Sequence, residues 1–346
     1  MSEPAAEVAE NGAPAWRLSA ATETRLDTVL HAAIAELAGS LATPVTRVVG
    51  AGGKRLRPAL TLAVAGLGQL PEQAAGVLDR AAAVELLHCA TLIHDDLLDG
   101  AAVRRGAATV NAAEGMGSAV LSGDLLIAAA GVLAGRASQH AGTVIAQTLA
   151  SLCRGEALEA DLRFDATATL EQLLDVIRLK TGSLTQAACV LGAAAAGLPG
   201  DVVDGVAEYG MEFGISLQLI DDVVDVVSTP ALAGKPVGVD FLAGTVTMPA
   251  IFAMQHTPEL RSLLRPGLDD ISRRRALSLL RSPATVHSSV LCAVEHAVTA
   301  GAALRAVGHG QPAIEQLAQW PLQYLRSQLD AKPDGSQLGE SLGVRT

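Results

Sequence analysis

Two aspartate clusters are the part of this sequence best suited to chemistry. The first reads Asp-Asp-Leu-Leu-Asp and the second Asp-Asp-Val-Val-Asp, and together they contain Asp95, Asp96, Asp99, Asp221, Asp222 and Asp225. In a helix the first and last aspartates of each cluster share a face, whereas the middle one points about 100° away. Like charges at this spacing destabilise a helix unless a cation compensates them. Carboxylate oxygens are ligands that Mg²⁺ accepts alongside substrate phosphates.

A solvated acidic helix face is the alternative interpretation of either cluster alone. Two clusters with identical spacing, each following a long apolar stretch, favour a metal site instead. If the two clusters face each other, they form one oxygen-rich site. The sequence therefore predicts carboxylates that hold Mg²⁺ against a phosphorylated substrate.

Basic residues in separate segments could bind the phosphates. Lys54 and Arg57 lie in Gly-Gly-Lys-Arg-Leu-Arg-Pro, where glycines allow close backbone approach and a helix start favours anions. The pair Arg104 and Arg105 follows the first aspartate cluster, and Lys180 and Lys235 precede and follow the second. Basic loops are usually solvated, so each segment alone is a weak signal. Several of them in an acidic protein indicate two phosphorylated substrates.

His88 lies seven residues before Asp95, which places it two helical turns away on the same face. A single histidine on an apolar helix is most often a core residue. Its register with the aspartate makes substrate binding an equal alternative. His94 points elsewhere, and we interpret it as a supporting or structural residue.

The elements that must position these residues are helices. Half of the 346 residues are apolar and only 2% are aromatic, so alanine, leucine and valine supply the core. Helical spacing covers most of the chain between loose tails at 1–20 and 331–346, whereas residues 101–114 look irregular and strand patterns are nearly missing. We therefore predict an all-α protein, with one large helical bundle over residues 21–330.

Charge and cysteine content exclude several classes of protein. A net charge of −11 argues against a nucleic-acid-binding protein. Four cysteines without a Cys-x-x-Cys pair indicate reduced thiols and a cytoplasmic location. The longest uncharged run, 181–200, is rich in alanine and glycine, so we expect a core helix and no transmembrane span. Peripheral contact with a membrane stays open.

The combined motifs resemble those of the trans-type polyprenyl (isoprenyl) diphosphate synthases. The likeness runs from about residue 45 to about 257 and is carried by GGKRLRP (52–58), ELLHCATLIHDDLLD (85–99), RRG (104–106), GD (123–124), GE (155–156), KTG (180–182), QLIDDVVD (218–225) and GKPVGVD (234–240). The resemblance implies an all-α, isoprenoid synthase-like bundle around a central cavity, usually as a homodimer. It also implies Mg²⁺-dependent condensation of an allylic diphosphate with isopentenyl diphosphate.

The resemblance further implies a role for individual residues. Mg²⁺ around the allylic diphosphate would be held by Asp95, Asp96, Asp99 and Asp221, supported by Asp222 and Asp225. Arg104, Lys180 and Lys235 would clamp that diphosphate, and Lys54, Arg57, His88 and Arg105 would bind isopentenyl diphosphate. Thr181 and Gln218 would line the reacting carbons.

The sequence departs from the family pattern at three positions. Thr245 stands where a diphosphate-binding lysine is usual, Leu217 where phenylalanine is common, and Glu159 where glutamine commonly follows the Gly-Glu pair. None of these changes removes a predicted metal ligand. They bear on affinity and rate.

Product length is expected to depend on the residues below the first aspartate cluster. Ala90 and Thr91 are small where large aromatics would stop chain growth early, and 125–131 contains no aromatic residue. We therefore favour a medium- or long-chain all-trans product, in the heptaprenyl to decaprenyl range, grown from farnesyl or geranylgeranyl diphosphate. Tight helix packing also explains such small residues. A short-chain farnesyl or geranylgeranyl diphosphate synthase and a non-catalytic subunit of a heteromeric synthase remain alternatives.

Overall fold

A computed structural model describes residues 16–69, 76–228, 238–308 and 310–330. It divides into two compact units. Unit 1 combines the chain up to Leu149 with Leu184–Ala207, and unit 2 combines Ala150–Ser183 with the chain from Glu208 onwards. Two long helices therefore contribute residues to both units.

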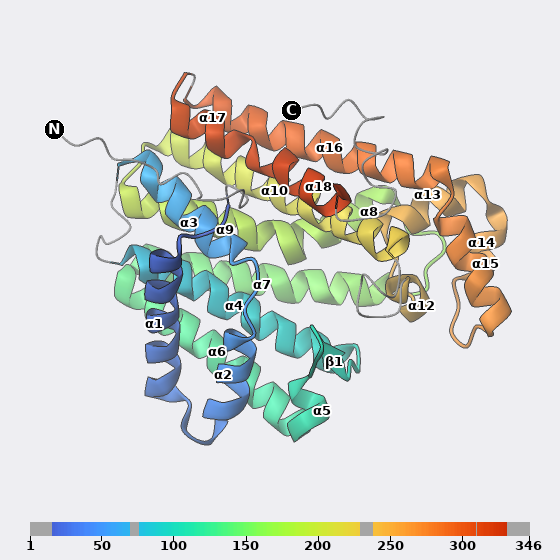
Figure 1. The fold of residues 1–346 in the computed structure, drawn as a ribbon, viewed down its shortest axis with the longest axis horizontal. Helices are drawn as coiled ribbons and strands as arrows, with labels where there is room; N and C mark the ends of the chain where they lie inside the picture. Colours follow the sequence, from blue (N-terminus) through green and yellow to red (C-terminus); the bar gives the residue numbers. More distant parts are fainter. Residues whose placement is uncertain (1–15, 70–75, 229–237, 309, 331–346) are drawn as a thin grey trace. The chain divides into compact units, whose positions relative to one another are not determined.

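Unit 1 is built from helices and one small hairpin (Figure 1). Its elements are α1 (Ala20–Leu37), η2 (Gly39–Leu41), α2 (Ala42–Gly50), α3 (Leu56–Leu67), α4 (Val77–Leu98), β1 (Val103–Arg104), β2 (Ala107–Ala108), α5 (Val110–Glu114), α6 (Met116–Ala137), the first half of α7 (Gln139–Asp161), nearly all of α9 (Ser183–Ala196) and the start of α10 (Gly200–Val227).

The described residues of unit 2 form helices joined by loops, without a strand. It contains the end of α7, α8 (Leu170–Ile177), the π-helical turn η3 (Arg178–Gly182), most of α10, α12 (Val239–Ala243), α13 (Met248–His256), α14 (Pro258–Leu263), α15 (Asp270–Leu280), α16 (Pro283–Ala306), α17 (Pro312–Ala318) and α18 (Trp320–Asp330).

Small side chains let the helices of unit 1 pack closely. α4 packs against α1, α3 and α6, and its segment Ala81–Val84 is completely buried. Gly192 of α9 lies so close to α3 that an added Cβ would overlap the carbonyl oxygen of Thr61. The alanine- and glycine-rich composition therefore sets short distances between helices.

In unit 2, α10 is fixed to α16, α17 and α18 by aromatic and hydroxyl contacts. Tyr209 and Phe213 of α10 are fully buried, and the ring of Phe213 meets that of Tyr324 edge-on at 6.1 Å between centroids. The Tyr209 hydroxyl donates to the carbonyl of Leu317 at 2.9 Å, and the Ser216 hydroxyl donates to that of Ala293 at 2.9 Å. These contacts hold the helix that carries the second aspartate cluster.

The prediction of an all-α fold is confirmed, with two local differences. Residues 103–108 form an antiparallel hairpin and 110–114 a short helix, where the sequence indicated only irregular chain. Trp16, in the expected N-terminal tail, is 4% exposed, and Ala20, the last residue of that tail, already begins α1. Residues 1–15 and 331–346 lie outside the described residues. The hairpin matters because it carries the predicted basic pair.

Most of the uncharged run 181–200 forms the mostly buried helix α9, as expected. A different helix, α6, is long and apolar enough to cross a membrane by length and composition, and 39% of its most apolar stretch is buried. All four cysteines are free thiols; Cys153 is exposed, and Cys89 and Cys189 are buried.

Candidate active site

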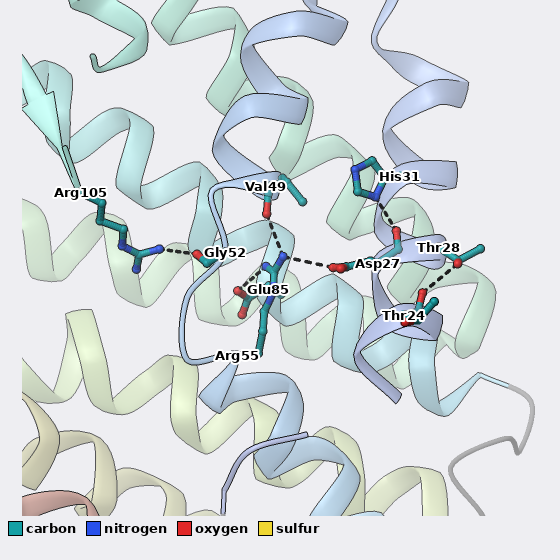
Figure 2. A network of polar contacts seen from close by, with 9 residues as sticks. All are labelled: Thr24, Asp27, Thr28, His31, Val49, Gly52, Arg55, Glu85 and Arg105. Atoms are coloured by element: carbon teal, nitrogen blue, oxygen red, sulfur yellow. Dashed lines mark hydrogen bonds and ion pairs between the residues drawn. The ribbon is translucent and has the colours of Figure 1, made fainter. Parts of the chain in front are cut away.

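The glycine-rich loop meets the hairpin in unit 1, and we call the basic residues of these two segments, Lys54, Arg57, Arg104 and Arg105, the basic cluster. The Arg105 guanidinium donates to the Gly52 carbonyl, and an added Cβ at Gly53 would lie 3.0 Å from the same guanidinium (Figure 2). Gly53 has a φ of 155°, which only glycine adopts readily. The structure thus brings the two predicted isopentenyl diphosphate segments together.

His88 faces this basic cluster from α4. Burial lowers the pKa of His88 well below its usual value, and the positive charges of Arg57, Arg105 and Arg104 lower it further. The imidazole is therefore neutral at pH 7, and its ring can both donate and accept a hydrogen bond. A neutral ring among arginines leaves the positive charge of the cluster available to an anion.

The first aspartate cluster ends α4, next to the basic cluster. Asp95 is half-buried, Asp99 is exposed at the C-cap, and Asp96 is 6% exposed. The Arg104 Nε donates to Asp96 Oδ1 at 2.7 Å. Burial raises the pKa of Asp96, and the Arg104 contact opposes that rise. Asp95 and Asp99 therefore share one face, as predicted, whereas Asp96 is bound by an arginine expected to clamp the diphosphate.

His94 has the structural role that the sequence indicated. Its Nε2 lies 3.3 Å from the Val120 carbonyl oxygen and 3.7 Å from Asp124 Oδ1, both on α6. A Cβ at Gly123 would overlap the imidazole. The Gly-Asp motif of α6 therefore makes room for His94 and fixes α4 directly beside Asp95.

The second aspartate cluster lies on α10 in unit 2. Gln218 donates from Nε2 to Asp222 Oδ1 at 2.9 Å and accepts from the Thr181 hydroxyl at 2.9 Å. Burial raises the pKa of Asp222 well above its usual value, and the neighbouring charges of Asp240 and Asp221 add to this effect. Three predicted site residues, Thr181, Gln218 and Asp222, thus form one hydrogen-bonded chain.

Lys180 projects from the π-helical turn η3, a distortion that often occurs at functional sites. Its ammonium lies 2.6 Å from Glu156 Oε2 and also pairs with Glu159. Burial alone would lower the pKa of Lys180, but these two carboxylates outweigh it and raise the pKa. Lys180 is therefore cationic, and its charge is shared with two acids before any diphosphate binds.

Several expectations stay predictions. Lys235 lies outside the described residues. Among the residues that the structure describes, no group of three or more His, Cys, Asp or Glu side chains is arranged to hold a metal ion. The donor chemistry nevertheless fits a hard divalent cation, because each cluster offers only carboxylate oxygens.

The predicted chain-length residues lie on the buried side of α4. Ala90 is fully buried and Thr91 is half-buried, and Thr91 donates to the carbonyl of His88 at 2.8 Å. On α6, Ala129 and Ala130 are buried, whereas Ala128 is exposed. The small residues at 90 and 91 and two of the three alanines of α6 therefore belong to the interior.

Sequence reasoning assigned no role to two residues that contact the site. Glu156 holds Lys180, and Arg55 occupies the middle of the basic loop with its guanidinium buried (Figure 2). Glu156 lies in the Gly-Glu motif, which was the available signal. For Arg55 the motif showed a cation but not its direction.

A family model, polyprenyl synthetase, matches residues 39–277, which is more than half of the chain. The chain is 38% identical over 268 residues to nonaprenyl diphosphate synthase of Mycobacterium tuberculosis, covering 76% of this chain and 78% of that protein. The chain therefore belongs to the polyprenyl synthetase family. It is a polyprenyl diphosphate synthase, a prenyltransferase.

Solved structures agree. A decaprenyl diphosphate synthase from Rhodobacter capsulatus matches with a TM-score of 0.80 at 30% identity, covering 89% of this chain and 96% of that one. A polyprenyl synthase from Caulobacter crescentus, complexed with calcium and isoprenyl diphosphate, matches with a TM-score of 0.80 at 29% identity, covering 87% and 94%. These likenesses confirm the predicted fold class.

Proposed function

We propose that this protein extends an allylic diphosphate with successive isopentenyl diphosphate units to a medium- or long-chain all-trans product. One observation carries the proposal. A single helix, α4, presents His88 to a cluster of arginines and, two turns later on the same face, begins the Asp95–Asp99 cluster. One end of this face suits an anion, and the other suits a divalent cation.

The basic cluster is suited to isopentenyl diphosphate. Lys54, Arg57 and Arg105 offer charge and planar donor pairs, and neutral His88 adds a hydrogen bond. Held there, the substrate's double bond would attack the allylic carbon as the carbon–oxygen bond to the departing diphosphate breaks. A new carbon–carbon bond forms, and the proton lost from the isopentenyl unit passes to the released diphosphate. Orientation by these residues supplies much of the rate.

Both aspartate clusters are proposed to hold Mg²⁺ around the allylic diphosphate. Support comes from their carboxylate donors and from the relative whose solved structure is described as complexed with calcium. When bound, the metal stabilises charge on the leaving diphosphate. Lys180 and Arg104 would add positive charge. For this, Lys180 would exchange its contacts with Glu156 and Glu159 for the phosphate, and Arg104 its contact with Asp96. Thr181 of η3 and Gln218 of α10 would line the reacting carbons.

The proposed product length rests on Ala90 and on the named products of relatives. Ala90 is small and buried within two helical turns before Asp95, so it would not stop chain growth there as a large aromatic side chain would. Relatives are described as nonaprenyl and decaprenyl diphosphate synthases. The primer proposed is farnesyl or geranylgeranyl diphosphate.

The purified protein is to be incubated with Mg²⁺, farnesyl diphosphate and labelled isopentenyl diphosphate, and the products sized. We expect products in the heptaprenyl to decaprenyl range and no label incorporation after chelation. A product that stops at geranylgeranyl diphosphate would establish the short-chain alternative. A folded protein that is inactive alone but active with a second chain would establish the subunit alternative.

A cytoplasmic homodimer is the proposed form of the protein. The free cysteines support the location, and α6 supports the dimer. Leu121 is 56% exposed and Val132 38% exposed, and nothing lies within 4 Å of a Cβ built at Gly131 or Gly135. A second copy would cover this apolar helix face. Sedimentation of a Leu121→Lys/Val132→Lys variant is expected to give monomers. The matched control is Ile271→Lys on α15, where Ile271 is 74% exposed, and it should sediment as wild type.

A further inference from the structure

Arg55 occupies the middle of the basic loop, but its guanidinium is buried and bonded to three other residues. Its side chain is only 5% exposed, and Nη1 donates to Glu85 Oε1 at 2.8 Å (Figure 2). Nη2 donates to the Val49 carbonyl at 2.8 Å and to Asp27 Oδ1 at 3.3 Å. One guanidinium thus ties the loop to α1, to the end of α2 and to α4.

The backbone at Arg55 adopts a conformation that its side chain must stabilise. Its φ of 47° and ψ of 34° lie in the left-handed region, which is strained for an L-residue that has a Cβ. The turn allows Leu56 to begin α3 directly, so that Lys54 and Arg57 stand on either side of a fixed point. The hydrogen bonds of the buried guanidinium offset this backbone strain.

The partner on α4 explains why an arginine is needed. Glu85 is 7% exposed and lies one turn before His88 on the same face of α4. An unpaired buried carboxylate at this position would repel a diphosphate and would itself be costly to bury. Arg55 neutralises it with a direct hydrogen bond, and the positive charge of Arg55 also helps to keep His88 neutral.

We propose that Arg55 is a positioning residue for isopentenyl diphosphate: through Glu85 and the Val49 carbonyl it fixes the turn that aims Lys54 and Arg57 at the same anion as His88. It does not touch the substrate. The inference rests on the proposed function and deepens it, because it assigns the geometry of one of the two substrate sites to a residue outside that site.

The test separates positioning from stability. In Arg55→Met/Glu85→Met the buried pair is replaced by apolar side chains of similar length, a change that is often tolerated by folding. We expect KM for isopentenyl diphosphate to rise about 10- to 100-fold, while KM for the allylic diphosphate and kcat stay within about threefold. Arg55→Lys keeps the charge but not the three-way fork, so an intermediate rise is expected.

Arg80→Met is the matched control. Arg80 is also a buried arginine of unit 1, 8% exposed, but it bonds the Gly76 and Ala137 carbonyls at the other end of α4. We expect it to lower the melting temperature without changing either KM.

Calorimetric titration of each variant with isopentenyl diphosphate alone gives a readout that does not need turnover. A folded double variant with wild-type affinity for isopentenyl diphosphate would overturn the inference. A KM that rises equally for isopentenyl diphosphate and for the allylic diphosphate would overturn it as well. If the double variant does not fold, Arg55→Lys decides by the same criterion. Wild-type protein that neither binds nor consumes isopentenyl diphosphate would instead refute the proposed function.

Discussion

The ion pair between His296 of α16 and Glu212 of α10 makes stability depend on pH in a predictable way. His296 Nδ1 lies 2.6 Å from Glu212 Oε2, and the two side chains are 17% and 19% exposed. Burial alone would lower the pKa of His296, but hydrogen bonds with Cys292 and Glu212 outweigh it and raise the pKa from 6.5 to about 9. Each pKa unit corresponds to about 1.4 kcal/mol, so the contacts of protonated His296 with Cys292 and Glu212 together contribute at most about 3 kcal/mol, less where solvent screens them.

The sign of this pH dependence follows from whether the folded or the unfolded state binds the proton of His296 more tightly. The folded protein keeps its proton up to pH 9, whereas the unfolded chain loses it near 6.5. The stabilisation is therefore complete below pH 6.5 and is lost as the pH rises through 9. Within this window the free energy of unfolding should fall by up to about 1.4 kcal/mol per pH unit.

Urea unfolding of wild type and His296→Gln at pH 6 to 10 measures this effect. We expect the difference in unfolding free energy between them to shrink by up to about 3 kcal/mol across the range. His287→Gln, an exposed position on the same helix, should track wild type throughout. Repeating the series in a Cys292→Ser background assigns the slope to the imidazole if it persists. Parallel curves for wild type and His296→Gln would refute the reasoning.

Three further changes test packing, product length and the lysine site. Gly192→Ala should lower the unfolding free energy measured in urea by up to about 2 kcal/mol, because overpacking against α3 exceeds the gain in helix propensity. The control Gly66→Ala, in open space on α3, should raise the unfolding free energy by up to about 1 kcal/mol. Equal effects of the two substitutions would contradict the packing argument. Ala90→Phe should shorten the products seen by chromatography, and unchanged lengths would remove Ala90 from the growing chain's path. Glu159→Gln leaves Lys180 with one carboxylate fewer, so more of its positive charge is available to the substrate. KM for the allylic diphosphate should therefore fall about fivefold in initial-rate assays, equivalent to about 1 kcal/mol. A rise in KM would show that Glu159 assists binding.

Local patterns made much of the fold predictable. Thr169 and Gln172 have the three-residue spacing of a capping box, and they form one at the start of α8. The helical spacing of the apolar residues predicts the helical class, because burial of one helix face depends on spacing along the chain. The π-helical turn within 178–182 was not predictable, since its widened geometry depends on packing such as that of Gly182 against Met211.

The candidate site was predictable in its residues but not in their pairing. The spacing of Asp95 and Asp99 determines that they share a helix face. It does not show that Asp96 turns to Arg104, because that contact requires the hairpin at 103–108 to fold back on α4. Lys180 was expected at a diphosphate, and only the folded chain shows that Glu156 and Glu159 hold it.

By itself, the sequence determined the helical class, the two carboxylate clusters and the separate basic segments, because residue type and local spacing are written directly in the chain. Tertiary structure decided which charges neutralise each other. Arg55 and Arg57 are two residues apart, yet a left-handed turn buries the first against Glu85 and leaves the second facing His88. Breaking the buried pair of Arg55 and Glu85 is costly because it would leave a desolvated charge without a partner. These groups are desolvated only once the helices have packed.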